Sequence, residues 1–92
     1  MNVVVKHRIT DPEQFFSGDP EEIAANAPDG VEAKQFFPSV DRSEAVCLWG
    51  GPSIDAVREY IDSVTGDSAE NTYFEVSAEF AMGLPEAAGA SA

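Results

Sequence analysis

The sequence predicts a single α+β domain whose strands and helices follow one another in the order βαββαβ. Runs of β-branched, aromatic and other apolar residues predict four strands, at residues 2–10, 31–38, 44–49 and 72–78. Helix-start signals separate the first two strands, and an amphipathic segment separates the last two. Right-handed connections in a sheet of this order place all the helical segments on one face.

The first strand carries the only histidine of the chain. His7 alternates in step with Val3, Val5 and Ile9, so its side chain is expected to point into an apolar layer. A histidine in such a layer is either a hydrogen-bonded structural residue or a ligand or general base. The pattern leaves both interpretations open.

Two similar helix starts follow the first strand. Asp11 and Asp19 each precede a proline, which is the arrangement of an N-terminal capping carboxylate with proline at the first helical position. We expect a short helical turn that carries Phe15 and Phe16. A second helical piece is then expected to extend to about Ala27.

The third strand forms an antiparallel hairpin with the second and is apolar on both sides. Its apolar positions are Val46 and Leu48 on one side, and Ala45, Cys47 and Trp49 on the other. Such a strand belongs in the sheet centre. We expect it to run beside the first strand and parallel to it, which would bring Cys47 near His7. A lone cysteine in a central strand is, however, usually a small core residue.

Ser53 is expected to cap the longest helix, which ends at Gly66. One face of this helix is apolar and consists of Ile54, Val57, Ile61 and Val64. In the fourth strand, at residues 72–78, one alternating set is expected to be buried, namely Thr72, Phe74, Val76 and Ala78. Residues 1–85 therefore form one ferredoxin-like domain, and residues 86–92 are expected to be a disordered tail.

The opposite face of the sheet carries no helix in this arrangement. Because the third strand is apolar on both sides, that face would present apolar side chains to solvent unless something covers it. We therefore expect a homodimer in which two sheets pack face to face.

The chain is strongly acidic. It has 17 Asp and Glu against 5 Lys and Arg, which gives a net charge of -12. This composition resembles that of cytoplasmic proteins from salt-accumulating halophiles, and the alternative is an ordinary acidic protein. The few cationic residues are scattered along the chain, so nucleic acid is not an expected partner.

The absence of certain sequence segments also limits where the protein is expected to be located. No stretch approaches the roughly 18 apolar residues of a membrane span, and the N-terminal residues do not follow a signal-peptide plan. We expect a cytoplasmic protein with no membrane partner. Cys47 is the only cysteine, which excludes an internal disulfide and a multi-cysteine zinc site.

Over residues 2–78 the chain resembles the dimeric α+β barrel superfamily, which includes small monooxygenases and muconolactone-isomerase-like proteins. Residues 45–59, AVCLWGGPSIDAVRE, are similar to one small family of largely unknown function with some members regarded as nickel-binding. That family places a histidine late in its first strand, where this chain has His7. It often has another after the Arg-Glu pair, where this chain has Tyr60. The resemblance implies a divalent metal such as nickel, with His7 as a ligand.

Several aromatic residues are candidates for the wall of a pocket between sheet and helices. The candidate ligand-binding residues are His7, Phe36, Cys47, Trp49, Tyr60 and Tyr73, with Phe37 beside them. Ordinary core packing is the alternative for each aromatic residue. His7 is also the one candidate for a catalytic residue.

Three functions remain open on this evidence. The first is a homodimeric binding module for a small molecule or a divalent metal, and the second is a cofactor-free monooxygenase-like or isomerase-like enzyme acting on a small aromatic substrate. The third is an accessory subunit without a site. An enclosed volume of about 300 Å³ or more, with His7 in its wall, is the observation that supports a ligand site.

The acidic composition leads to a prediction about salt. Screening by salt removes repulsion among the carboxylates faster than it weakens the few ion pairs, so the melting temperature should rise between about 0.1 M and about 2 M potassium chloride. Thermal unfolding followed by circular dichroism measures this. Chloride is preferred because sulfate stabilises most proteins by exclusion from their surface. A flat or falling curve would identify the chain as an ordinary acidic protein.

Overall fold

The computed structural model describes residues 1–85, and the predicted tail at residues 86–92 lies outside them. The elements are β1 (Asn2–Ile9), α1 (Pro12–Phe15), α2 (Pro20–Ala25), β2 (Glu32–Pro38), β3 (Glu44–Gly50), α3 (Ile54–Thr65), the short 3-10 helix η1 (Gly66–Ser68) and β4 (Ala69–Glu75). This is the predicted α+β chain order. Within residues 1–85, no helix is both long enough and apolar enough to cross a membrane.

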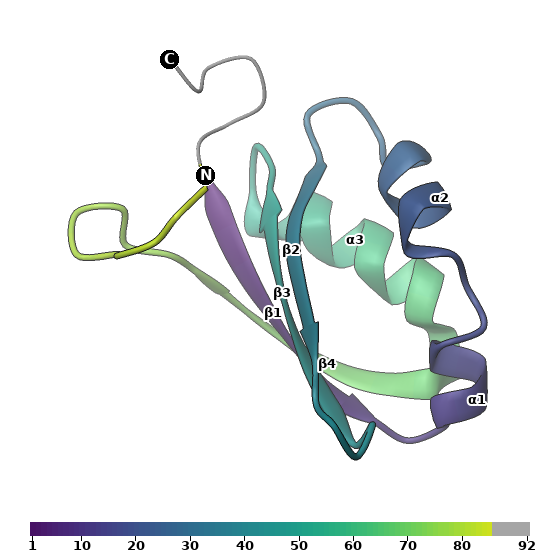
Figure 1. The fold of residues 1–92 in the computed structure, drawn as a ribbon. Helices are drawn as coiled ribbons and strands as arrows, with labels where there is room; N and C mark the ends of the chain where they lie inside the picture. The colour runs from purple at the N-terminus through teal and green to yellow at the C-terminus, as the bar shows by residue number, and fades with distance from the viewer. Residues whose placement is uncertain (86–92) are drawn as a thin grey trace.

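The four strands form one antiparallel sheet in the order β2-β3-β1-β4. The helices α1, α2 and α3 lie on the same side of this sheet (Figure 1), an arrangement compatible with a ferredoxin-like fold. The expectation that β3 runs parallel to β1 was wrong, because the two strands pair antiparallel. The helical connection brings β2 back in the direction of β1, and the hairpin then reverses the chain into β3.

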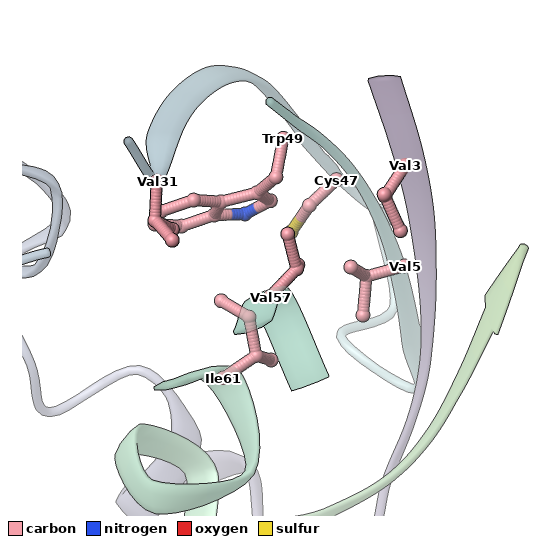
Figure 2. Packing of buried hydrophobic residues seen from close by; sticks show 7 residues of the cluster. All are labelled: Val3, Val5, Val31, Cys47, Trp49, Val57 and Ile61. Carbon is pink, nitrogen blue, oxygen red and sulfur yellow. The ribbon is translucent and has the colours of Figure 1, made fainter. Parts of the chain in front are cut away.

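The core lies between the sheet and α3. Figure 2 shows side chains of β1 and β3 facing those of α3, and the cluster consists of Val3, Val5, Val31, Cys47, Trp49, Val57 and Ile61. The predicted alternation of β1 is confirmed, since His7 is buried on the same face as Val3, Val5 and Ile9. A polar imidazole therefore lies at one end of an otherwise apolar layer.

The helix starts were predicted correctly. The side chain of Asp11 accepts a hydrogen bond from the backbone N–H of Gln14, and that of Asp19 accepts one from Glu21. The second helical piece ends at Ala25, before the expected end at about Ala27.

The close packing of α3 against the end of β3 depends on a glycine. Ser53 caps α3 through a hydrogen bond from the backbone N–H of Ala56 at 3.1 Å. A Cβ atom at Gly51 would lie only 2.7 Å from Cγ2 of the buried Val57. Glycine at this position therefore lets the first turn of α3 approach the sheet.

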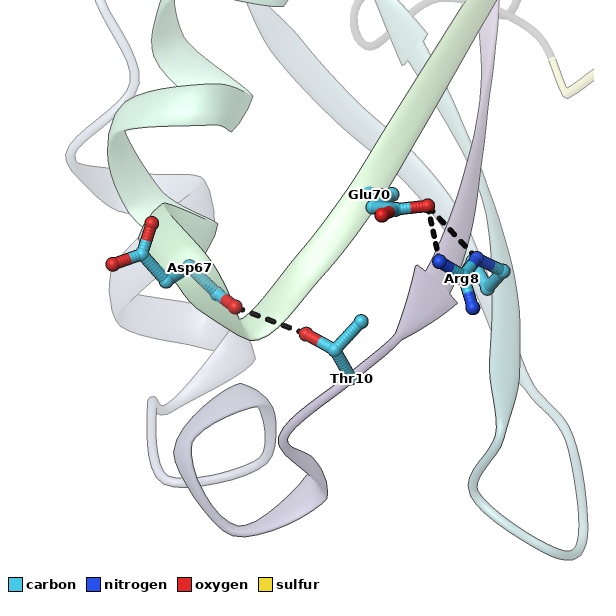
Figure 3. Close-up of polar contacts among 4 residues, drawn as sticks. All are labelled: Arg8, Thr10, Asp67 and Glu70. Carbon is cyan, nitrogen blue, oxygen red and sulfur yellow. Dashed lines mark hydrogen bonds and ion pairs between the residues drawn. The ribbon is translucent and has the colours of Figure 1, made fainter.

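The fourth strand was predicted three residues too far along the chain. β4 covers Ala69–Glu75 instead of residues 72–78, because it starts directly after η1 and pairs with β1 from Ile9 onward. The side-chain hydroxyl of Thr10 donates to the carbonyl of Asp67 at 2.9 Å and ties the end of β1 to η1 (Figure 3). Farther along the pair, Arg8 and Glu70 form an exposed ion pair.

The two faces of β4 are also exchanged relative to the prediction. Tyr73 is partly buried and packs against the core cluster, whereas Thr72 and Phe74 are exposed. The alternation was recognised correctly, but Phe74 belongs to the face without helices. Val76 and Ala78, expected in the strand, follow its end.

The helix-free face carries apolar side chains from all four strands. Cross-strand pairing places Val4 beside Leu48 and Phe74, and Val46 beside Phe37. Exposure is 39% for Val46, 50% for Phe74 and 60% for Phe37, whereas Leu48 near the sheet centre is 6% exposed. Three large apolar side chains on this face are thus accessible in the single chain.

Candidate functional site

A pocket of about 580 Å³ opens between the helix-bearing face of the sheet and the helices. β1 and β3 contribute His7, Cys47 and Trp49 to its wall, and β2 contributes Phe36. β2 also contributes Ala33, Lys34 and Gln35. The helices and the link between α1 and α2 supply the rest of the wall, which includes Gln14, Phe15, Phe16, Ile23, Ile61, Val64 and Thr65. This volume is above about 300 Å³, although the pocket is open to solvent on one side and not enclosed.

Aromatic rings dominate one side of this pocket. Phe15 lies with its ring centroid 5.2 Å from that of His7 and 5.0 Å from that of Phe16, both in edge-on geometry. Phe36 is 6.4 Å from Phe15. These rings come from α1 and β2, so a flat apolar molecule would meet aromatic carbon from two elements.

His7 is the central polar residue of the wall. Its Nδ1 is 2.6 Å from Oδ1 of Asn71, its direct neighbour on β4, and its Nε2 is 2.9 Å from Sγ of Cys47 on β3. The imidazole is 4% exposed. A contact between His7 and Cys47 was considered possible on the premise of parallel strands, and the structure has this contact in an antiparallel pair.

The surrounding hydrogen bonds fix the protonation of the imidazole. The hydroxyl of Thr65 donates to the carbonyl of Ile61, so its oxygen accepts from Nδ2 of Asn71, at 2.9 Å. Nδ2 also donates to the carboxylate of Asp62 at 3.1 Å. Oδ1 of Asn71 therefore faces His7 as an acceptor, and the hydrogen of neutral His7 lies on Nδ1. Nε2 is left to accept from the Cys47 thiol.

Both members of the pair are held in their neutral forms. Burial lowers the pKa of His7 from its usual 6.5, while the hydrogen bond to Asn71 and the charge of Asp62 oppose that shift. Burial also raises the pKa of the Cys47 thiol to about 12. At neutral pH the contact is therefore a thiol donating to an uncharged imidazole.

Tyr73 closes the polar chain at its outer end. Its hydroxyl donates to the same oxygen of Asp62 that accepts from Asn71. Burial raises the pKa of Tyr73 well above its ordinary value, and the bond to Asp62 adds to that shift. The carboxylate of Asp62 is thus held by two donors on β4.

Four of the six predicted ligand-binding residues line the pocket. His7, Phe36, Cys47 and Trp49 belong to its wall, whereas Tyr60 and Tyr73 do not. Tyr60 packs edge-on against Trp49 at 5.8 Å and donates its hydroxyl to the carbonyl of Ile23 at 2.5 Å. It therefore supports the wall from behind by joining α3 to α2.

Phe37, the neighbour of Phe36, points to the opposite face of the sheet, where it lies beside Val46. The structure adds Phe15, Phe16 and Asn71 to the predicted set. The first two were placed correctly on a helical turn, but nothing in the sequence pattern indicated that their rings face His7. Asn71 was missed because the fourth strand was expected to begin one residue after it.

The residues present do not fit a metal centre. Among residues 1–85 there is no group of three or more His, Cys, Asp and Glu side chains arranged to hold a metal ion. His7 and Cys47 supply two donor atoms, and their 2.9 Å separation matches a direct hydrogen bond. A metal ligated by both atoms would hold them farther apart. Tyr60, where the resembling family often has histidine, is turned toward Ile23.

Comparisons of the chain with protein-family models, with curated proteins and with solved structures return no match. The geometry of the pocket is therefore the basis on which a function can be assigned.

The buried imidazole leads to a prediction about pH. Because the folded pKa of His7 lies below its unfolded value, the unfolded chain takes up a proton first as the pH falls through about 6.5. The contribution of His7 to the free energy of unfolding is therefore complete above that pH and is lost below it. Urea unfolding at about pH 7.5 and about pH 5.5 should show a larger loss for the wild type than for His7→Gln. Equal losses in the two proteins would contradict the buried neutral imidazole.

Proposed function

We propose that the protein is a cytoplasmic homodimeric binding module for a small, largely apolar molecule. The observation that carries the proposal is the pocket of about 580 Å³ with His7 in its wall. Ligand sites of drug-sized molecules are clefts of about 300–1,000 Å³ with mostly apolar walls and a few polar groups. This pocket has that size and that composition.

The charges of the chain narrow the class of ligand. The net charge of -12 disfavours an anion, and the only cationic side chain of the wall, Lys34, donates its Nζ to Oδ1 of Asn2 at 2.7 Å. Phe15, Phe16 and Phe36 supply aromatic surface. A neutral aromatic molecule with one or two polar atoms is therefore the ligand that the site favours.

A fluorescent neutral probe, 2-naphthol, tests this proposal. Titration followed by backbone amide NMR should shift resonances of α1, β2 and β3 around the pocket. Val64→Trp places a large ring in the pocket wall and should weaken binding about tenfold or more, which corresponds to about 1.4 kcal/mol. Val40→Trp, on the exposed hairpin between β2 and β3, is the matched control and should bind normally. Absence of binding, or equal loss in both variants, would refute the pocket.

One observation favours the alternative of a cofactor-free enzyme. The bonds around Asn71 leave Nε2 of neutral His7 as a proton acceptor at the pocket wall. An isomerase-like or monooxygenase-like reaction needs such a group to move a proton. Of the two aromatic residues expected to orient a substrate, Trp49 is in the wall and Tyr60 is behind it.

The homodimer belongs to the same proposal. The helix-free face combines exposed Val46, Phe74 and Phe37, and an apolar surface of this kind is typical of an interface. Lys6 lies on this face beside Val46 and Thr72, and Arg8 lies on it beside Glu44 and Glu70. Because two of the five basic residues are here, two copies of an acidic chain repel each other less through this face than elsewhere.

Light scattering in about 1 M potassium chloride tests the dimer, since salt removes the general repulsion. The wild type should have twice the mass of the chain at micromolar concentration, with an interface above about 1,000 Å². Phe74→Glu should give the monomer while keeping its circular dichroism spectrum. Phe80→Glu, at an exposed position after β4, is the control and should stay dimeric. A monomeric wild type would refute the dimer without affecting the pocket.

A further inference from the structure

The pocket wall contains a continuous hydrogen-bonded chain that ends at a thiol. It runs from Asp62 on α3 through Asn71 on β4 and His7 on β1 to Cys47 on β3, with donor-to-acceptor distances of 3.1, 2.6 and 2.9 Å. Each residue comes from a different element, so the geometry is set by the sheet and its helix. Both His7 and Cys47 line the pocket.

We infer that Cys47 is a nucleophile that adds to a neutral α,β-unsaturated carbonyl compound bound in the pocket, with His7 as the base and Asn71 as a positioning residue. This inference rests on the proposed ligand pocket and assigns it a reaction. Nucleophile, base and orienting group stand in hydrogen-bonded succession, which is the arrangement that activates side-chain nucleophiles in enzymes.

The proposed step is balanced and needs no oxidant or reductant. As the Sγ–carbon bond forms at the β-carbon of the ligand, the thiol proton moves to Nε2 of His7 and the carbon–carbon π bond opens toward the carbonyl. His7 then returns the same proton to the α-carbon of the ligand. The product is a thioether of Cys47, and the reverse sequence releases the alkene with freedom to rotate about the bond in between.

The chain behind His7 suits this transfer. When His7 takes the thiol proton it becomes a cation whose Nδ1–H donates to Oδ1 of Asn71, and Asn71 in turn donates to the carboxylate of Asp62. The negative charge of Asp62 favours protonated His7, while burial disfavours it. The imidazolium is therefore supported during the reaction without being the resting state, which keeps His7 available as a base.

The side chains of the pocket wall favour an uncharged aromatic compound as the electrophile. The rings of Phe15 and Phe36 and the indole of Trp49 surround the thiol–imidazole pair with aromatic carbon. The ammonium of Lys34 lies at Asn2, five residues along β1 from His7, so no cation faces the thiol–imidazole pair from this side chain. An uncharged aromatic enone satisfies both conditions.

Benzylideneacetone is the probe, and intact-mass spectrometry counts its adducts. Cys47 is the only cysteine, and Cys47→Ser identifies the adduct because it removes the sole thiol. In the native protein the rate of adduct formation should saturate with probe concentration. His7→Gln should lower the rate about tenfold or more, within the range expected for loss of a general base. Asn71→Ala should also lower it, and Val40→Ala should not.

Two further readouts separate the inference from reaction of an unfolded chain. The wild-type rate should fall as the pH is lowered and His7 becomes protonated. This step should be absent in His7→Gln, which has no imidazole, and should move to a lower pH in Asn71→Ala, which keeps the imidazole but loses the hydrogen bond that raises its pKa. A rate that is independent of probe concentration and rises with urea would show that only the opened chain reacts, and would overturn the inference. No adduct in the native wild type would overturn it as well.

The saturated analogue benzylacetone distinguishes failure of the inference from failure of the proposed function. It has nearly the same shape but has no alkene to attack. If benzylacetone shifts the pocket resonances and benzylideneacetone forms no adduct, the binding site stands and Cys47 is only a core residue. If neither compound binds, both the pocket and the reaction are refuted.

Discussion

The central position of β1 is the constraint on which the rest of this structure depends. β1 pairs with β3 on one side and β4 on the other, so every side chain of its buried face meets neighbours from both strands. At most positions these neighbours are apolar and form the core. At His7 they supply an amide and a thiol, and the imidazole is buried without an unsatisfied nitrogen. The strand pairing of β1 therefore determines both the order of the sheet and the hydrogen bonds of His7 in the pocket wall.

The acidic composition affects the stability of the chain and its contacts with other molecules, and it does not determine the fold. The core and the pocket wall consist almost entirely of uncharged residues, so the excess carboxylates belong to the surface. They raise the free energy of the compact chain through mutual repulsion, which salt screens. The helix-free face differs, because it carries two basic residues, Lys6 beside Val46 and Arg8 beside Glu44 and Glu70. Charge thus favours contact between copies through that face without specifying how they pack.

Much of the fold could be predicted from local patterns, and the failures that affect the site concern the position and the faces of β4. Runs of β-branched, aromatic and other apolar residues identified all four strands, and the Asp-Pro pairs identified two helix starts. Alternation cannot tell which face of a sheet the helices cover when both faces carry apolar residues, so Phe74 was expected inside and Tyr73 outside. The same shift of β4 concealed Asn71, the cross-strand partner of His7. A residue such as Asn71, which reaches the site only through its pairing partner on β1, could therefore not be identified from the sequence, because the sequence does not specify how the strands are aligned.

The pocket and the uncovered sheet face both reduce the stability that this small domain can reach alone. A chain of 92 residues buries a modest share of its surface, and here part of its interior is a pocket of about 580 Å³ while Phe37 and Phe74 face solvent. A ligand that binds only the folded state stabilises it by RT ln(1 + [L]/Kd), or about 2.7 kcal/mol at a hundredfold excess over Kd. A second subunit acts in the same way. The pocket and the helix-free face lie on opposite sides of one sheet, so β1 and β3 form part of the pocket wall on one side and the centre of the uncovered face on the other.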